Sequence, residues 1–186
     1  MYESADLRKG LKIEMDGEPY VIVDFEFLKP GKGQSLYQCK LKNMVTGAQF
    51  DRTYRSGDKF NEAALEEQEM EFLYADGESY CFMNTATYEQ EFLTAEQIGD
   101  NVQLLKENTV CQVLLFEERP IGVTLPNFVE LRITETDPWV KGDTAAGSTK
   151  PATLETGYVV QVPPFIEKEE IVRIDTRTGA YVERVK

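Results

Sequence analysis

The sequence predicts an all-β protein built from small antiparallel barrels. Three observations support this fold class: short segments that alternate apolar with polar residues, closely spaced turn signals, and a sparse helical pattern. The chain has 186 residues, of which 41% are hydrophobic. This composition can form packed cores and argues against an intrinsically disordered chain. The length allows one to three small domains.

The first predicted element is a hairpin. Residues 19–28 and residues 35–42 each show the partial alternation of a half-buried strand. Between them lies a segment rich in proline and glycine, Lys29-Pro30-Gly31-Lys32-Gly33-Gln34. Two strands around such a turn indicate a hairpin.

The predicted tip of this hairpin presents a single cation, Lys32, between Gly31 and Gly33. Pro30 fixes one φ angle, and the glycines permit positive φ and remove side-chain bulk. Strands at roughly 3.3 Å per residue would make an arm about 20 Å long. Such an arm could place an ammonium group inside a narrow pocket. The alternative is an ordinary exposed turn.

Three tight turns echo one another along the chain. Residues 16–20 and 76–80 share the form D-G-E-x-Y, and residues 178–181 partly repeat it. Each predicts a turn that leads into a strand. Three barrels of about 60 residues would account for the length, although D-G turns are common in all-β proteins. We predict three domains, which comprise residues 1–63, 64–127 and 128–186.

Helical signal is confined to short segments. Thr94 is a predicted N-cap for residues 95–98, which end at Gly99, and residues 101–105 can add a further turn or two. Residues 61–70 have helix-forming composition. We interpret them as a linker that enters a strand at residues 69–74.

Composition excludes several kinds of catalytic site. The chain has no histidine, which removes Ser-His and Cys-His nucleophiles and histidine-ligated metals. It has no Walker loop or dinucleotide fingerprint. Among 33 acidic residues, close pairs occur by chance, so no general acid/base pair can be identified from the sequence. We therefore expect no catalytic residues, no metal and no cofactor, and predict that the protein is not an enzyme.

Targeting signals are equally absent from the sequence. No apolar run approaches the roughly 20 residues that span a bilayer, and the first residues do not resemble a signal peptide. Cys39, Cys81 and Cys111 are odd in number and far apart, which favours buried thiols over a disulfide framework. We expect a cytoplasmic protein with no membrane partner.

The formal net charge of −13 is unevenly distributed. Residues 1–63 carry 10 basic and 10 acidic side chains, residues 64–127 carry 2 and 13, and residues 128–186 carry 8 and 10. A phosphate backbone would repel the middle third, so any contact with nucleic acid should involve the ends. The alternative is that the acidic surface serves solubility alone.

Two segments are candidates for that contact. Residues 29–59 hold 7 basic and 2 acidic side chains, and we select as phosphate contacts Lys40, Lys42, Arg52 and Arg55. Lys40 and Lys42 are two residues apart, so in a strand their side chains lie on the same face. The second segment is the polar loop at residues 141–151, whose amides, hydroxyls and lysines suit RNA. Either could instead be only a solvated surface.

Several motifs, in order along the whole chain, resemble the bacterial elongation factor P family. They include the tip at residues 29–34, residues 98–101, residues 126–131, residues 142–145 with 150–157, Val162-Pro163 with Phe165-Ile166, and residues 175–179. The resemblance implies three barrels in an elongated L shape. These would be an SH3-like, KOW-type N-terminal barrel and then an acidic central and a C-terminal OB-fold barrel.

The resemblance also implies a function. Members of the family bind the ribosome between the peptidyl and exit tRNA sites and relieve stalling at consecutive prolines. The implied partners are both ribosomal subunits, rRNA, peptidyl-tRNA and a lysine-modifying enzyme, with the factor itself a monomer. The tip lysine, here Lys32, would approach the CCA end of peptidyl-tRNA, supported by the tip-loop residues Lys29, Pro30, Gly31, Gly33 and Gln34. The implied contacts with the small subunit and codon are Gly142, Asp143, Thr144 and Lys150.

Three residues depart from the family pattern. Trp139 and Glu169 stand where the family has glycine, and Pro164 replaces an aliphatic residue. We expect Trp139 to pack between the last two domains or to add a stacking contact, and Glu169 to accompany a changed strand or bulge. The alternative functions are an elongation factor P-like paralogue, a general OB-type single-strand-binding protein, and an enzyme acting on acidic or sugar substrates. The net charge argues against the second and the missing histidine against the third.

Overall fold

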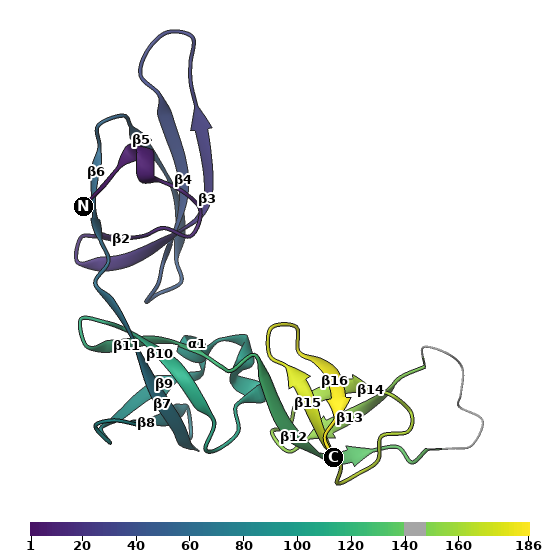
Figure 1. Cartoon of the computed structure of the whole chain (residues 1–186). Helices are drawn as coiled ribbons and strands as arrows, with labels where there is room; N and C mark the ends of the chain where they lie inside the picture. Colours follow the sequence, from purple (N-terminus) through teal and green to yellow (C-terminus); the bar gives the residue numbers. More distant parts are fainter. Residues whose placement is uncertain (140–147) are drawn as a thin grey trace. The chain divides into compact units, whose positions relative to one another are not determined.

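The computed structural model describes residues 1–139 and 148–186, and within them β-strand is the main secondary structure and helix is rare, as predicted (Figure 1). The strands form three separate antiparallel sheets. The short helical elements are η1 (Ser4–Asp6), α1 (Ala95–Ile98) and η2 (Asp100–Leu104). The all-β prediction is therefore confirmed.

The first sheet has the strand order β1-β6-β2-β3-β4-β5. Its strands are β1 (Tyr2–Glu3), β2 (Lys12–Met15), β3 (Glu18–Leu28), β4 (Leu36–Asn43), β5 (Gln49–Arg55) and β6 (Lys59–Glu62). The sheet encloses a small core in which Ile13, Ile22 and Leu41 are almost completely buried. The predicted hairpin of residues 19–28 and 35–42 is confirmed as β3 and β4.

The second sheet has the order β11-β10-β7-β8-β9. Its strands are β7 (Leu65–Asp76), β8 (Ser79–Asn84), β9 (Gln90–Thr94), β10 (Val110–Phe116) and β11 (Arg119–Thr124). The predicted cap is confirmed: Gln97 N donates to Thr94 Oγ1 at 3.3 Å, and Thr94 N donates to Gln97 Oε1 at 2.9 Å. The helix ends at Gly99, whose φ is 86°.

The linker predicted at residues 61–70 is wrong, whereas the strand predicted at residues 69–74 is confirmed as part of β7. β6 continues to Glu62, and β7 already begins at Leu65, so that most of this segment is strand. Its residues favour helix when isolated, but β7 gains ladder hydrogen bonds from β8 and β10 on either side. Strand pairing with distant partners overrides the local helix propensity.

The third sheet has the order β14-β13-β12-β15-β16. Its strands are β12 (Phe128–Thr136), β13 (Lys150–Leu154), β14 (Val159–Val162), β15 (Ile171–Asp175) and β16 (Ala180–Arg184). The three echoing turns join β2 to β3, β7 to β8 and β15 to β16. Gly17, Gly77 and Gly179 each have a positive φ in these turns, which explains the recurring glycine.

The chain forms two compact units, residues 1–66 with 115–121 and residues 67–114 with 122–186. The boundaries near residues 63 and 127 stay a prediction. All three cysteines are buried and free, as expected. No helix in the described part of the chain is long and apolar enough to cross a membrane.

Candidate functional site

The β3–β4 hairpin, residues 18–43, forms an arm whose tip loop extends beyond the other strands of its sheet (Figure 1). Phe25 and Tyr37 still pack against the barrel core. Beyond Phe25, the two strands remain paired from Glu26–Gln38 to Leu28–Leu36, and β5 runs beside β4 along this stretch as far as Arg55, the partner of Leu36. The part of the arm without a neighbouring strand is therefore the tip loop.

The tip, residues 29–34, is fully exposed. Gly33 has a φ of 108°, whereas Gly31 does not adopt a positive φ. Only one of the two glycines is therefore required by the backbone of this turn. Within the described residues Lys32 has no hydrogen bond or ion pair, so its ammonium group is available to a partner.

Three aromatic rings line one side of the arm. The rings of Phe25 and Tyr37 are stacked, with centroids 6.1 Å apart, and the centroids of Phe27 and Tyr37 are 5.0 Å apart. Ring pairs at these distances add stability beyond their buried area and stiffen the hairpin. Sequence reasoning missed them as site residues, although the spacing of two between Phe25 and Phe27 indicates a shared strand face.

The strand register separates two faces of this sheet. The outer sheet face carries the polar residues Asp24, Glu26, Gln38, Lys40, Lys42, Asp51, Thr53 and Arg55, and the inner sheet face carries Phe25, Phe27, Tyr37, Cys39, Arg52 and Tyr54. Lys40 and Lys42 share the outer face, as their spacing predicted. Arg52 and Arg55 lie on opposite faces, so the four predicted phosphate contacts do not form one patch.

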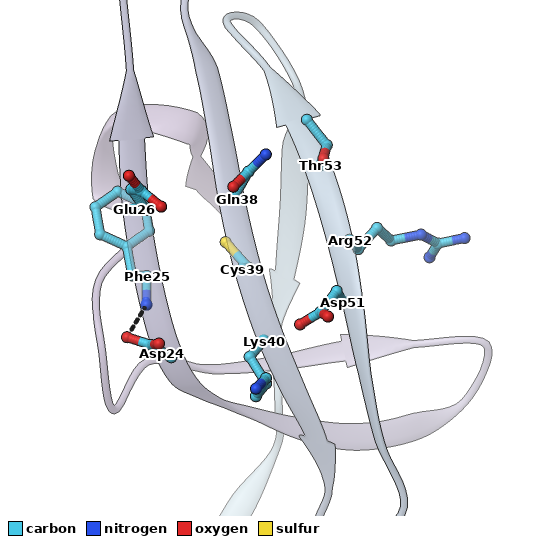
Figure 2. Close-up of a pocket in the computed structure, with 9 residues that line it drawn as sticks. All are labelled: Asp24, Phe25, Glu26, Gln38, Cys39, Lys40, Asp51, Arg52 and Thr53. Carbon is cyan, nitrogen blue, oxygen red and sulfur yellow. Dashed lines mark hydrogen bonds between the residues drawn. The ribbon is translucent and has the colours of Figure 1, made fainter.

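Lys40 lies between two carboxylates. It is the register partner of Asp24 on β3 and of Asp51 on β5, and these side chains border a shallow cavity of about 330 Å³ (Figure 2). Lys42, in contrast, has the neutral partners Val21 and Gln49. The two carboxylates reduce the positive potential around Lys40, so Lys42 is the stronger candidate for a phosphate contact.

Arg52 extends away from Lys40 and Asp51 (Figure 2). Its Nη1 donates to the Met15 sulfur at 3.6 Å, and Tyr54 Oη donates to the same sulfur at 3.1 Å. Burial raises the pKa of Tyr54. Because a thioether is a weak acceptor, Arg52 keeps most of its donors for another partner.

The second candidate segment is only partly described. Gly142, Asp143 and Thr144 lie outside the described residues. Lys150 begins β13, and its ammonium donates to the carbonyl of Asp137. Thr149 Oγ1 donates to Gln161 Oε1 at 3.1 Å or accepts from its amide group. Lys150 therefore contacts the end of the chain segment that precedes this loop, and this leaves it fewer donors for RNA.

Two residues that depart from the family pattern come together. Trp139 and Pro164 line a cavity of about 270 Å³ with Asp137, Thr149 and Lys150. All of these belong to the C-terminal segment, and Trp139 is half exposed. The structure therefore favours an available stacking surface over packing between the last two domains.

Glu169 keeps the backbone conformation of a glycine. Its φ is 73°, its N–H donates to Ile133 O at 2.9 Å, and its carboxylate accepts from Arg132 Nη1 at 2.6 Å. A register shift does occur in β12, between Ile133 and Glu135, but it lies in the pairing of β12 with β13, so the expected link between Glu169 and a changed strand stays a prediction. The change in sequence is thus accommodated without loss of the strand pairing.

The described residues offer binding surfaces and no evident reaction centre. In residues 1–139 and 148–186 no group of three or more Cys, Asp or Glu side chains could hold a metal ion. The exposed cation at the end of the arm is a surface group that could contact a partner. The fold and the arm therefore define an all-β protein whose candidate site is an exposed binding surface.

Comparison with known proteins identifies the particular family. The elongation factor P KOW-like domain matches residues 3–60, the elongation factor P OB domain matches residues 65–123, and the elongation factor P C-terminal domain matches residues 129–184. The chain belongs to the elongation factor P family, a family of translation elongation factors.

Relatives match over the full length. Elongation factor P of Desulforapulum autotrophicum is 68% identical over 185 residues, covering 100% of this chain and 99% of the relative. Elongation factor P of Desulfosudis oleivorans is 68% identical over 186 residues, covering all of both chains. Among solved structures, eukaryotic translation initiation factor 5A from Methanococcus jannaschii has a TM-score of 0.55 at 19% identity, covering 67% of this chain and 90% of that one. The latter likeness concerns the fold alone.

Proposed function

We propose that this protein binds the ribosome between the peptidyl and exit tRNA sites and accelerates peptide-bond formation when consecutive prolines stall translation. The observation that carries the proposal is the exposed Lys32 at the end of the arm. Membership of the family supports a role in elongation. The shape of the arm suits access to a pocket too narrow for a globular domain.

The proposed mechanism is positional. Proline is a constrained and poor nucleophile, and a prolyl nascent chain orients its ester badly. A tip that orders the acceptor end of peptidyl-tRNA supplies proximity and orientation without donating a catalytic acid or base. A rate gain of about 10² to 10⁴ requires about 3 to 5 kcal/mol, which ordered contacts can provide.

Other parts of the chain would hold the factor in place. Lys42 and Arg55 are the favoured contacts to acceptor-stem or ribosomal RNA phosphates, with Lys40 weakened by its carboxylate neighbours. The segment of residues 142–150 would approach the small subunit and the exit-site codon. The acidic residues 64–127 would face protein or solvent, because phosphate would repel them. We propose that the factor acts as a cytoplasmic monomer with three domains.

A stalling reporter tests this function. Translation of a reporter with three consecutive prolines is measured in a system that lacks its own factor, with wild-type protein purified from its native host. We expect full-length product to rise with the wild type and to rise far less with Lys32→Ala. A matched reporter with alanines in place of the prolines should respond to neither protein. Equal rescue by Lys32→Ala would contradict the role of the tip.

The proposed modification of Lys32 is tested by mass. The tip peptide is isolated from protein expressed in the native host and compared with its calculated mass. An added group localised to Lys32 supports a lysine-modifying enzyme as a partner. An unshifted mass contradicts the modification and assigns the rescue to the bare lysine and the turn that holds it.

A further inference from the structure

The sulfur of Met15 accepts hydrogen bonds from two side chains. Met15 is the last residue of β2, and its sulfur accepts from Tyr54 Oη at 3.1 Å and from Arg52 Nη1 at 3.6 Å. Met44 and Met83 are half-buried like Met15, but in the described part of the chain neither of their sulfurs accepts a hydrogen bond. The setting of Met15 is therefore polar in a way that simple packing of a thioether does not require.

The two donors differ in how firmly they are held. Tyr54 is buried, and its ring packs edge-on against Phe60 with the ring centroids 4.6 Å apart, which fixes the position of its hydroxyl. Arg52 is exposed, and its hydrogen bond to the sulfur is long. In the sheet, β3 and β4 lie between β2 and β5, so these contacts join strands that are not neighbours. The sulfur thus has one fixed donor and one movable donor.

Of the sulfur atoms near Arg52, that of Met15 is the one open to oxidation. Cys39, the register partner of Arg52, is 2% exposed, and burial raises the pKa of its thiol, so it holds little of the reactive thiolate. A thioether needs no deprotonation before it reacts. Met15 is only half-buried and precedes the exposed turn of residues 16–17, where a small oxidant has access.

We propose that Met15 is a reversible oxidation site, at which hydrogen peroxide converts the thioether to a sulfoxide whose oxygen is bound by Arg52 and Tyr54. A lone pair of the sulfur attacks one peroxide oxygen, and the O–O bond breaks. The departing oxygen takes the proton of the attacked oxygen and leaves as water. Sulfur supplies the two electrons that the peroxide gains. Methionine sulfoxide can be reduced enzymatically, which makes the modification reversible.

The oxidation acts mainly on Arg52. A thioether is a weak acceptor, whereas a sulfoxide oxygen is polar and strong, so the long contact with Arg52 becomes an ordinary hydrogen bond. Tyr54 already points its hydroxyl at the same place. Arg52, which is otherwise available to solvent, is then withdrawn from other partners. Only this last consequence, for a phosphate contact, rests on the proposed function.

The first test maps the oxidation in the folded full-length protein. The protein is treated with limiting hydrogen peroxide at neutral pH, and its peptides are weighed. We expect Met15 to gain one oxygen atom while the circular dichroism spectrum is unchanged, and Met70, which is 1% exposed, to remain unoxidised. Met44 is the reference within the same molecule. An unoxidised Met15 in protein whose Met44 has gained oxygen would overturn the proposal.

The second test measures the capture of Arg52. Phenylglyoxal labels free guanidinium groups, and labelling of Arg52 should fall about fivefold on oxidation, the factor that corresponds to one hydrogen bond of ordinary net strength. Arg55, on the opposite face of the same strand, is the matched control and should keep its labelling. Met15→Leu preserves an apolar, half-buried side chain without sulfur, and in it peroxide should leave Arg52 unchanged. Constant Arg52 labelling in the oxidised wild type, or an equal fall in Met15→Leu, would overturn the proposal.

These results are distinguishable from those of the stalling reporter, because both measurements use the isolated protein. Capture of Arg52 without rescue would leave the oxidation site in place and remove the proposed ribosomal role. Rescue without capture would leave the role in place and remove the oxidation site.

Discussion

The two glycines of the tip are equivalent in sequence and different in structure. Gly33 has a φ of 108°, while Gly31 has no positive φ, and a Cβ would meet no atom within 4 Å at either position. In Gly33→Ala the alanine would have to adopt a positive φ, which costs about 1–2 kcal/mol. The turn that holds Lys32 would change its conformation to relieve this strain. We expect Gly33→Ala to lose most of its rescue of the proline reporter.

Gly31→Ala is the matched control for this prediction. It should rescue like the wild type and unfold at the wild-type temperature, whereas Gly33→Ala should unfold at a lower temperature by whatever strain the turn retains. Equal activity of the two alanine variants would show that the turn geometry does not matter to the tip.

The buried thiol of Cys111 should make the free energy of unfolding depend on pH. Burial raises its pKa from 9.0 to about 12. Because the folded pKa exceeds the unfolded one, its contribution to stability is complete below pH 9 and is lost as the pH rises toward 12. The difference in free energy of unfolding between wild type and Cys111→Ala should therefore narrow from pH 8 to pH 10.5 in urea titrations. A difference that is constant with pH would contradict the assignment.

At the scale of an element, the turn between β15 and β16 is more constrained than its counterpart between β7 and β8. Tyr158 Oη donates to Gly179 O at 2.9 Å, and a Cβ on Gly179 would lie 2.5 Å from that hydroxyl. Gly77 has a similar positive φ but open space around it. Gly77→Ala should cost about 1–2 kcal/mol, and Gly179→Ala more. In a Tyr158→Phe background the extra cost should disappear, measured as a double-mutant cycle of unfolding free energies. Additive effects would exclude the clash.

Elements set by local signals were predictable, and those set by distant partners were not. The arm follows from alternation around Pro30 and Gly33, and α1 from the cap at Thr94, because these signals act within a few residues. The strand at residues 69–74 was predicted, but the start of β7 at Leu65 was mistaken for a linker, because its helix-forming residues carry no local strand signal. The left-handed φ of Glu169 likewise depends on its contacts with β12, which no local pattern reveals.

In the candidate functional site, too, features set by nearby residues could be predicted and features set by distant strands could not. Exposure of Lys32 followed directly from the tip sequence. The opposite faces of Arg52 and Arg55 follow from their odd spacing once β5 is recognised as a strand. The carboxylates on either side of Lys40 could not be found from the sequence. Asp24 is aligned with Lys40 only because β3 has a bulge between Ile22 and Asp24, and Asp51 is aligned with it by the register between β4 and β5.

At the scale of the whole molecule, an acidic factor with net charge −13 must bind phosphate through a few well-placed cations. Its affinity for ribosomes should fall as salt rises, with a slope set by the number of phosphates contacted. Lys42→Ala should reduce the slope of log affinity against log salt by about one. The measurement is a series of dissociation constants at roughly 50 to 200 mM salt, the range over which phosphate contacts are screened.

Lys40→Ala is the matched variant on the same strand face, and it should reduce this slope less, because Asp24 and Asp51 already offset its charge. Glu96→Gln, an exposed change in the acidic segment, should leave the slope unaltered. A larger effect of Lys40 than of Lys42 would mean that the bound RNA displaces those carboxylates, and would move the phosphate contact to the centre of the outer sheet face.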